Sequence, residues 1–156
     1  MARVNVGIDP KYLADQHLIA ESVEIIMITG GLKKNNFKIK SAIPPFFKMG
    51  KGHINFFKNK IVYLKRRLDE VNKEMDNRGF KNSTNIDLDE YPEDLLNDWE
   101  PSKIDSEIIR RRVVERLITR IKGKPGSKFY RYNRVLIGDK IDIFANELNN
   151  SKLYFV

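Results

Sequence analysis

The sequence contains no cysteine among its 156 residues and only two histidines. The absence of cysteine excludes disulfides, thiolate metal sites and cysteine nucleophiles. Two histidines cannot by themselves build a histidine-rich metal site, and we expect neither a metal nor another cofactor. No apolar run approaches the ~18 residues of a membrane span, and no signal peptide opens the chain. These absences predict a soluble protein of the cytoplasm with no membrane partner.

Charged residues are abundant, with an excess of cations. Lysine and arginine number 29 against 21 acidic residues, for a formal net charge of +8. This excess favours polyanionic partners, nucleic acid first and an anionic membrane surface second, although ordinary soluble proteins can also be basic. A chain of 156 residues is most simply one domain with a single core, and we expect a monomer.

The first residues of the chain suit amine chemistry. Ala2 is small enough for an aminopeptidase to remove Met1, which would leave the α-amino group of Ala2 free. A free α-amino group titrates near pH ~7.7–8.0, so a useful fraction of it is the neutral nucleophile at neutral pH. An amine that attacks a carbon and forms an imine is a standard covalent catalyst, and a nearby carboxylate can assist it.

The first predicted helix follows Asp9 and Pro10, an N-cap and a first helical residue, and stops or loosens at Gly30-Gly31. His17, Glu21 and Glu24 share one narrow stripe of it, because their spacing is i, i+4 and i+7. The other faces are mostly apolar, which predicts a largely buried helix. Ionisable groups inside such a helix are costly unless they are paired or functional. The alternative is a solvent-exposed stripe on a helix packed along its other sides.

Between a loop at 37–58 and an acidic loop at 81–101, the chain predicts a second helix. Its apolar residues alternate at steps of four and three, which is typical of an amphipathic helix facing a helical partner. These residues are Phe57, Ile61, Leu64, Leu68, Val71 and Met75. Arg67 is expected on the helix surface with its other basic residues. The helix should end in a Schellman-type stop, with Gly79 in the left-handed conformation and Phe80 as the apolar contact.

A third helix is predicted from the N-cap Ser102 to about Gly123. Its apolar side is expected to contain Ile104, Ile108, Val114, Leu117, Ile118 and Ile121. Arg112, Arg116 and Arg120 recur at i, i+4 and i+8 on a different face, and we call them the arginine row. The sequence therefore predicts an all-α fold, a single compact domain of about three main helices with long loops.

Residues 128–134 interleave cations with aromatic rings in the order Lys-Phe-Tyr-Arg-Tyr-Asn-Arg. Cations neutralise phosphates, and aromatic rings stack on exposed bases at ~1–3 kcal/mol per base. The alternative is that the aromatic rings close the core while the cations coat its surface. His17 has a similar pair of interpretations, a phosphate contact or a structural histidine. His53 is expected to be structural, with no chemical role.

Four segments form a specific pattern in order along the chain. They are residues 13–18 (Leu-Ala-Asp-Gln-His-Leu) followed by Glu21 and Glu24, residues 52–57 (Gly-His-Ile-Asn-Phe-Phe) continuing through 66–67 to 78–80, residues 112–116, and residues 129–132. With this pattern, most of residues 2–132 resembles the phage pyrimidine-dimer DNA glycosylases of the endonuclease V type, which are small UV-repair enzymes. If the protein is phage-encoded, its compartment is the host cytoplasm.

The resemblance implies a fold in which the N-terminal segment is inserted between the helices. It assigns residues 1–138 to a domain like that of the family. The chain continues beyond the family's usual end, and residues 139–156 are expected to form an extension packed on the same domain. Its apolar residues are Ile141, Ile143, Phe144 and Leu148.

The resemblance also implies a reaction, that of a DNA glycosylase with abasic-site lyase activity. In the family, the α-amino group, here that of Ala2, attacks C1′ of the 5′ deoxyribose in a cyclobutane pyrimidine dimer. The resulting imine allows β-elimination of the 3′ phosphate, and the essential glutamate maps onto Glu24. The partner is double-stranded DNA, damaged or abasic. The expected DNA contacts are Arg3, Gln16, His17, Arg112, Arg116, Arg120, Phe129, Tyr130, Arg131 and Tyr132.

The chain departs from the family at two positions beside Glu24. Family members commonly have an arginine where this chain has Val23, and an aromatic residue where it has Ser22. A missing cation puts the choice of lesion in question while leaving the amine chemistry possible. Two alternatives therefore stand beside a dimer-specific enzyme: a glycosylase/lyase for another damaged or modified base, and a non-catalytic helical DNA-binding protein. A third is an interaction module for acidic protein partners.

Overall fold

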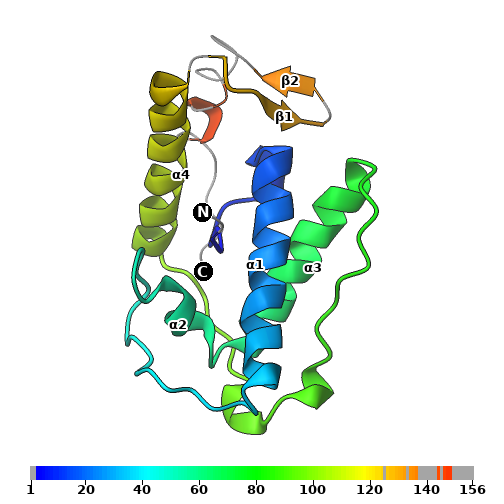
Figure 1. The fold of residues 1–156 in the computed structure, drawn as a ribbon, viewed down its shortest axis with the longest axis vertical. Helices are drawn as coiled ribbons and strands as arrows, with labels where there is room; N and C mark the ends of the chain where they lie inside the picture. The colour runs from blue at the N-terminus through cyan, green and yellow to red at the C-terminus, as the bar shows by residue number, and fades with distance from the viewer. Residues whose placement is uncertain (1–2, 125, 133, 137–143, 145, 149–156) are drawn as a thin grey trace. The chain divides into compact units, whose positions relative to one another are not determined.

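The computed structural model describes residues 3–124, 126–132, 134–136, 144 and 146–148, and its regular structure is mostly helical. In chain order the elements are η1 (Pro10–Tyr12), α1 (Asp15–Lys34), α2 (His53–Phe57), α3 (Ile61–Asn77), η2 (Leu88–Glu90), η3 (Glu93–Leu95), α4 (Lys103–Gly123), β1 (Phe129–Arg131) and β2 (Arg134–Leu136), where η marks a 3-10 helix (Figure 1). The predicted helix-dominated fold is confirmed. Residues 1–4 and 20–100 form one compact unit, and residues 5–19 and 101–156 form a second.

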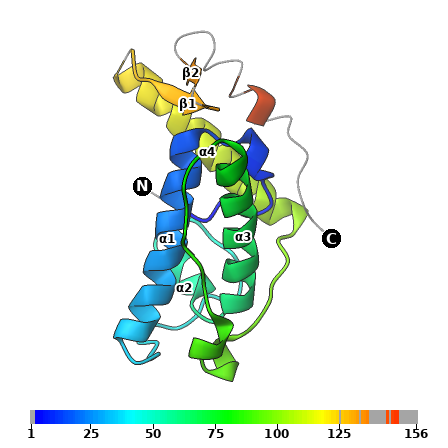
Figure 2. The ribbon, with the colours of Figure 1, turned by 90° about the vertical axis from the view of Figure 1, so that its right-hand side faces the viewer.

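In the first unit, α1 and α3 lie side by side, as both views of the ribbon show (Figures 1 and 2). The predicted amphipathic stripe of α3 is confirmed, because Ile61, Leu64, Leu68, Val71 and Met75 are all buried. Phe57 is buried as well, but it belongs to the short helix α2. Burial of this stripe removes large apolar side chains from water, each worth about 1.5–3 kcal/mol.

Helix α3 ends as its sequence predicts. The N–H of Phe80 donates to the carbonyl oxygen of Met75 at 2.9 Å, and that of Gly79 donates to Asp76 at 3.0 Å. Gly79 has a φ of +82°, the left-handed conformation that glycine adopts without a Cβ clash. These two bonds satisfy carbonyls that the end of a helix leaves unpaired, which defines the Schellman motif.

The start and end of α1 differ from the prediction. Asp9 accepts from the N–H of Lys11 and Pro10 follows it, but together they begin the 3-10 helix η1 rather than α1. Helix α1 begins at Asp15, because Leu13 is extended (φ −85°, ψ 149°) and interrupts the helical path. At the other end, α1 continues through both glycines to Lys34. A glycine costs only about 1 kcal/mol inside a helix, and burial of Leu32 beyond the glycines offsets that cost.

The faces of α1 are also distributed differently from the sequence expectation. Glu21 is fully buried, whereas Ile19, Val23 and Met27 are 42%, 51% and 64% exposed. The helix is therefore not buried all round. An apolar stripe at i, i+4 and i+8 faces outward, and one of the ionisable residues faces the core.

In the second unit, α4 begins and ends as predicted. Ser102 accepts from the N–H of Asp105, and the Asp105 side chain accepts from the N–H of Ser102, so the two form a capping box. The expected apolar side is wrong for three residues, since Ile104, Ile108 and Ile118 are exposed. The buried face contains Ser106, Ile109, Val113, Val114 and Leu117. At ~100° per residue, the three exposed isoleucines lie on the other side of the helix.

A two-stranded antiparallel hairpin, β1 with β2, includes most of the cationic and aromatic residues of 128–134 and was not predicted from the sequence. Phe129 pairs with Leu136, Tyr130 with Val135 and Arg131 with Arg134. Of the predicted C-terminal extension, Ile141 and Ile143 lie outside the described residues. Phe144 and Leu148 are buried.

The loop between α3 and α4 exposes its acidic side chains, as its polar and acidic composition predicts. Two short 3-10 helices, η2 and η3, interrupt it, and Asp87, Asp89, Glu90, Glu93 and Asp94 are exposed. Within the part of the chain that the structure describes, no group of three acidic or histidine side chains is placed to hold a metal ion. None of the described helices is both long enough and apolar enough to cross a bilayer.

Candidate functional site

Glu24 lines a pocket of about 290 Å³ in the first unit. Its wall residues are Glu24, Met27, Ile28, Gly31, Leu32, Asn35, Lys38, Ile54 and Lys58. The wall is mainly apolar, with one carboxylate, one amide and two ammonium groups. An apolar recess with a few polar groups is the usual character of a small-molecule site. Glu24 itself is half-buried, so its carboxylate is held by the helix while remaining accessible.

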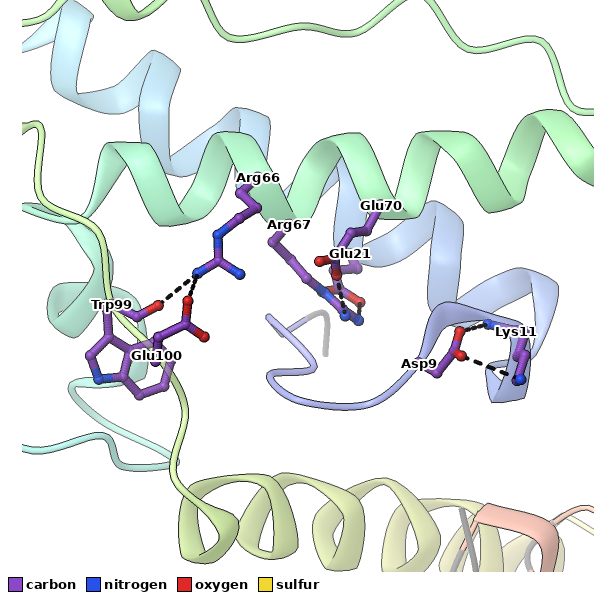
Figure 3. A network of polar contacts seen from close by, with 8 residues as sticks. All are labelled: Asp9, Lys11, Glu21, Arg66, Arg67, Glu70, Trp99 and Glu100. Carbon is purple, nitrogen blue, oxygen red and sulfur yellow. Dashed lines mark hydrogen bonds and ion pairs between the residues drawn. The ribbon is translucent and has the colours of Figure 1, made fainter. Parts of the chain in front are cut away.

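The neighbouring acid on α1, Glu21, is committed to a buried ion pair (Figure 3). Its two carboxylate oxygens accept from Nε and Nη2 of Arg67 at 2.6 and 3.1 Å, a bidentate arrangement. Burial by itself would lower the pKa of Arg67, but the Glu21 carboxylate raises it above its ordinary value. The expectation that Arg67 lies on the surface is wrong: its side chain is 2% exposed. Glu24, rather than Glu21, therefore has the accessible carboxylate.

His53 holds the N-terminal segment in the first unit. Its Nε2 accepts from the backbone N–H of Val4 at 3.1 Å, and its Nδ1 lies 3.1 Å from the carbonyl oxygen of Lys48. Val4 is fully buried and His53 is 4% exposed. The histidine therefore connects the segment after Ala2 to the loop before α2. The sequence predicts a structural His53, and its two bonds show which segments it joins.

An aromatic cluster lies beside His53, and the sequence did not predict it. The cluster consists of Phe47, Phe56, Phe57, Tyr63 and Trp99. The His53 ring meets the Phe47 and Phe57 rings edge to face, with centroids 5.5 and 5.3 Å apart. Close aromatic pairs of this kind add ~0.5–1.5 kcal/mol beyond their buried area. The local signal is the Phe56-Phe57 pair beside His53, but Trp99 lies 46 residues from His53 in the sequence.

In the second unit, Gln16 supports the hairpin. Its amide nitrogen donates to the carbonyl oxygen of Lys128 at 3.2 Å, and its amide oxygen accepts from the N–H of Tyr130 at 2.9 Å. The side chain thus pairs with β1 much as a neighbouring strand would. Asp15 adds a third bond, from the N–H of Tyr132 at 3.1 Å. The first residues of α1 therefore set the position of β1.

His17 is packed between two aromatic rings. The centroids of Phe129 and Phe144 each lie 6.2 Å from that of the imidazole. Nδ1 of His17 accepts from the N–H of Ala14 at 3.3 Å. Phe129 is buried, whereas Tyr130 and Tyr132 are 38% and 45% exposed. The two tyrosines are thus the rings of this segment that present an accessible face.

The arginines of the second unit differ in their contacts and in their exposure. Arg131 is half-buried, forms an ion pair with Glu147 and donates to the carbonyl oxygen of Lys11 at 3.2 Å. Within the arginine row, Arg112 is half-buried, and Arg116 and Arg120 are exposed. The guanidinium of Arg120 lies over the Phe129 ring, 5.6 Å from its centroid. The row therefore lies at the surface of α4.

The two units divide the predicted site residues between them. Glu24 and the half-buried Arg3 belong to the first unit. Gln16, His17, the arginine row and residues 129–132 belong to the second. Ala2, the predicted nucleophile, lies outside the described residues.

One protein family matches the part of the chain that contains Glu24 and His53. Residues 1–88 match the model of the family described as pyrimidine dimer DNA glycosylase. This range is more than half of the 156 residues. The chain belongs to this family. It is therefore a DNA glycosylase, an enzyme of DNA repair. The pocket lined by Glu24 and the hydrogen bond from Val4 to His53 both lie inside the matched range. The arginine row and the hairpin lie beyond it.

The two departures in this glycosylase differ in their surroundings. Val23 is 51% exposed on α1, directly before Glu24, whereas Ser22 is 5% exposed. A larger side chain at position 23 can extend into solvent. At position 22 an aromatic ring would have to displace packed neighbours, which is typically destabilising by about 1–3 kcal/mol.

Proposed function

We propose that this glycosylase also has abasic-site lyase activity and that the α-amino group of Ala2 is its nucleophile. With Met1 removed, the amine attacks C1′ of the 5′ deoxyribose in a cyclobutane pyrimidine dimer. The C1′–N bond breaks and the base leaves with the electron pair. The C1′–O4′ bond then opens, O4′ takes up the proton that the amine loses, and an imine joins Ala2 to C1′ of the sugar. Loss of a C2′ proton then expels the 3′ phosphate by β-elimination.

Glu24 is the carboxylate that we assign to this reaction. Its negative charge can stabilise the positive charge that develops on the sugar, and its basicity can serve the proton transfers. Two observations support the assignment. Glu24 lines the pocket, and the other acid on the same stripe of α1, Glu21, is bound to Arg67.

The observation that carries the proposal is the anchoring of the chain just after Ala2. Val4 is bound to His53 in the same unit as Glu24 and its pocket, and the family match covers all three. A nucleophile on an anchored chain loses less freedom when it reacts than one on a mobile terminus, and this raises its effective concentration.

We propose double-stranded DNA, damaged or abasic, as the substrate of a monomeric enzyme that needs no cofactor. Arg3, Arg112 and Arg116 are assigned to phosphates, and the exposed rings of Tyr130 and Tyr132 to the distorted duplex. Arg120 and Arg131 add positive charge. We also assign Gln16 and His17 to this DNA at the base of the hairpin, which Gln16 supports, and the buried Phe129 keeps its place in this group as a residue of the hairpin itself.

Borohydride trapping tests the proposal. Reduction converts an imine into a stable covalent link, so the wild-type protein should become attached to a duplex that contains an abasic site. Glu24→Gln should retain DNA binding and lose most base excision at a dimer, because glutamine keeps the shape but removes the charge. Glu93→Gln, on the exposed acidic loop, is the matched control and should behave as wild type.

Acetylation of Ala2 or retention of an extra N-terminal residue should abolish trapping. One extra residue moves the amine by up to about 3.3–3.6 Å, which is enough to lose a reactive geometry. Full activity in an acetylated protein would rule out the amine. Binding without trapping would indicate a DNA-binding protein without catalysis. Weak, salt-insensitive DNA binding would favour an acidic protein partner.

A glycosylase/lyase for another damaged or modified base is the second candidate. The observation that favours it is the exposed Val23, which lacks the cation that the family commonly places before the glutamate. Efficient trapping on abasic DNA together with poor excision at dimers would support this candidate over the first.

A further inference from the structure

We propose that His53 is a positioning residue that fixes where the nucleophilic amine lies, an inference that rests on the proposed function of Ala2. The hydrogen bond from Val4 to His53 joins residues 49 positions apart. It lies two residues from Ala2. A contact at this distance from the terminus limits how far the amine can move.

The geometry assigns the tautomer of His53. The backbone N–H of Val4 can only donate, so Nε2 must be the unprotonated nitrogen that accepts. The carbonyl of Lys48 can only accept, so Nδ1 carries the proton. Neutral His53 with its proton on Nδ1 satisfies both neighbours at once. A proton on Nε2 would face the N–H of Val4 and break the tether.

The surroundings favour this neutral form. Burial lowers the pKa of His53, the carbonyl of Lys48 raises it, the charge of Arg3 lowers it and that of Glu21 raises it, with a net decrease. The Phe47 and Phe57 rings hold the imidazole plane in place. The side chain therefore has a single orientation, and the bond to Val4 is directional.

The position of the tether explains why a histidine is suited to this place. The ring joins the loop at Lys48 to the segment at Val4, so it must donate on one side and accept on the other. The side-chain amide of an asparagine can replace only Nδ1, the ring nitrogen nearer the backbone. The amide of a glutamine reaches the position of Nε2 instead. The two substitutions therefore keep different halves of the contact.

This difference provides a matched pair of variants. His53→Gln retains an acceptor for the N–H of Val4, while His53→Asn retains a donor for the carbonyl of Lys48 and loses the acceptor. We expect the rate of imine trapping on abasic duplex to remain near wild type in His53→Gln. In His53→Asn it should fall by about tenfold to a hundredfold, since a displacement of ~1 Å can cost that much. The dissociation constant for DNA should be unchanged in both.

A second variant approaches the same bond from the other partner. Val4→Pro removes the backbone donor and leaves His53 in place. It should reduce the trapping rate about as much as His53→Asn. The double variant should be no slower than either single variant, because each removes the same interaction. This pair also preserves the test if one of the single variants fails to fold.

Amide hydrogen exchange at Val4 separates the tether from the chemistry. Exchange should be slow in wild type and His53→Gln, and fast in His53→Asn. Equal trapping rates in wild type and both single variants that lose the bond would overturn this inference while leaving the amine mechanism intact. A wild-type protein that traps nothing although Val4 is protected would instead overturn the proposed function.

Discussion

At the scale of single residues, the ion pair between Glu21 and Arg67 buries two opposite charges in the first unit. Both side chains are at most 2% exposed, and the two carboxylate oxygens match the guanidinium fork. Two charges removed from water gain little net energy from their attraction alone, but each needs the other once both are buried. The pair therefore fixes which face of α3 meets α1.

Removal of one partner should be much worse than removal of both. Arg67→Met should lower the free energy of unfolding by about 3–5 kcal/mol, because it removes the guanidinium that binds both oxygens of the buried Glu21 carboxylate. Glu21→Leu combined with Arg67→Met should recover most of that loss. Urea denaturation of the single and double variants measures this, with exposed Lys73→Met on the same helix as the control. Equal losses in the single and double variants would contradict this account.

Val23 is expected to influence which lesion the enzyme excises. An arginine there would add a permanent cation and up to five donors directly before Glu24. Because Val23 is 51% exposed, Val23→Arg should fold normally. We expect it to raise excision at dimers more than trapping on abasic DNA, with both assayed at one salt concentration. Equal gains on the two substrates would mean that the arginine only adds affinity.

At the scale of the secondary-structure elements, the ends of the helices depend on a few backbone positions. Gly79→Ala should destabilise the protein by about 1–2 kcal/mol, because the alanine must adopt the left-handed conformation at φ +82°. No atom lies within 4 Å of an added Cβ at this position, so the loss reports backbone strain alone.

Gly30→Ala is the matched control for that prediction. Gly30 lies within α1, also with nothing within 4 Å of an added Cβ. Alanine is favoured over glycine inside a helix by about 1 kcal/mol, so this variant should be more stable than wild type. Thermal unfolding of the two variants should therefore shift in opposite directions.

Helix α4 presents the arginine row, and its contribution is electrostatic. Arg116→Ala should weaken binding to damaged and undamaged duplex alike, because a phosphate contact conveys no base information. If the arginine neutralises one phosphate, the slope of log affinity against log salt should decrease by about 0.9. Arg112→Ala should behave similarly. Exposed Arg111→Ala, outside the row, is the control. Lower stability with an unchanged slope would assign the row to packing.

At the scale of the whole molecule, stability should depend on pH through His53. Its pKa in the folded protein lies below the ordinary value of 6.5, because burial disfavours the charged ring. The unfolded chain therefore takes up the proton first as the pH falls. The stabilisation is complete above pH 6.5 and decreases as the pH falls from 6.5 towards the folded pKa.

Urea denaturation between pH 8 and about pH 5 measures this dependence. The difference in unfolding free energy between wild type and His53→Gln should be constant above pH 6.5 and change below it. Glutamine does not titrate, so carboxylates common to both proteins cancel in the difference. A difference that is constant over the whole range would show that His53 has the same pKa in the folded and unfolded chains.

Features that depend on residues close together in the chain follow from the local sequence. The capping box at Ser102, the stop at Gly79 and the stripe of α3 each involve residues within a few positions, where backbone geometry dictates the contact. The motifs in residues 13–24 and 52–57 likewise indicate the glycosylase family, and they lie inside the range that the family match covers.

Which polar groups are buried together depends instead on how distant segments pack. Glu21 and Arg67 are 46 positions apart, Val4 and His53 are 49 apart, and Gln16 pairs with a strand more than 110 positions away. Periodicity placed Arg67 on the surface, because a basic residue in a helix is normally solvated. Burial becomes favourable only when packing brings a carboxylate against the guanidinium, and no local pattern encodes that distance. For the same reason the sequence did not predict the hairpin, whose position depends on hydrogen bonds to side chains of α1.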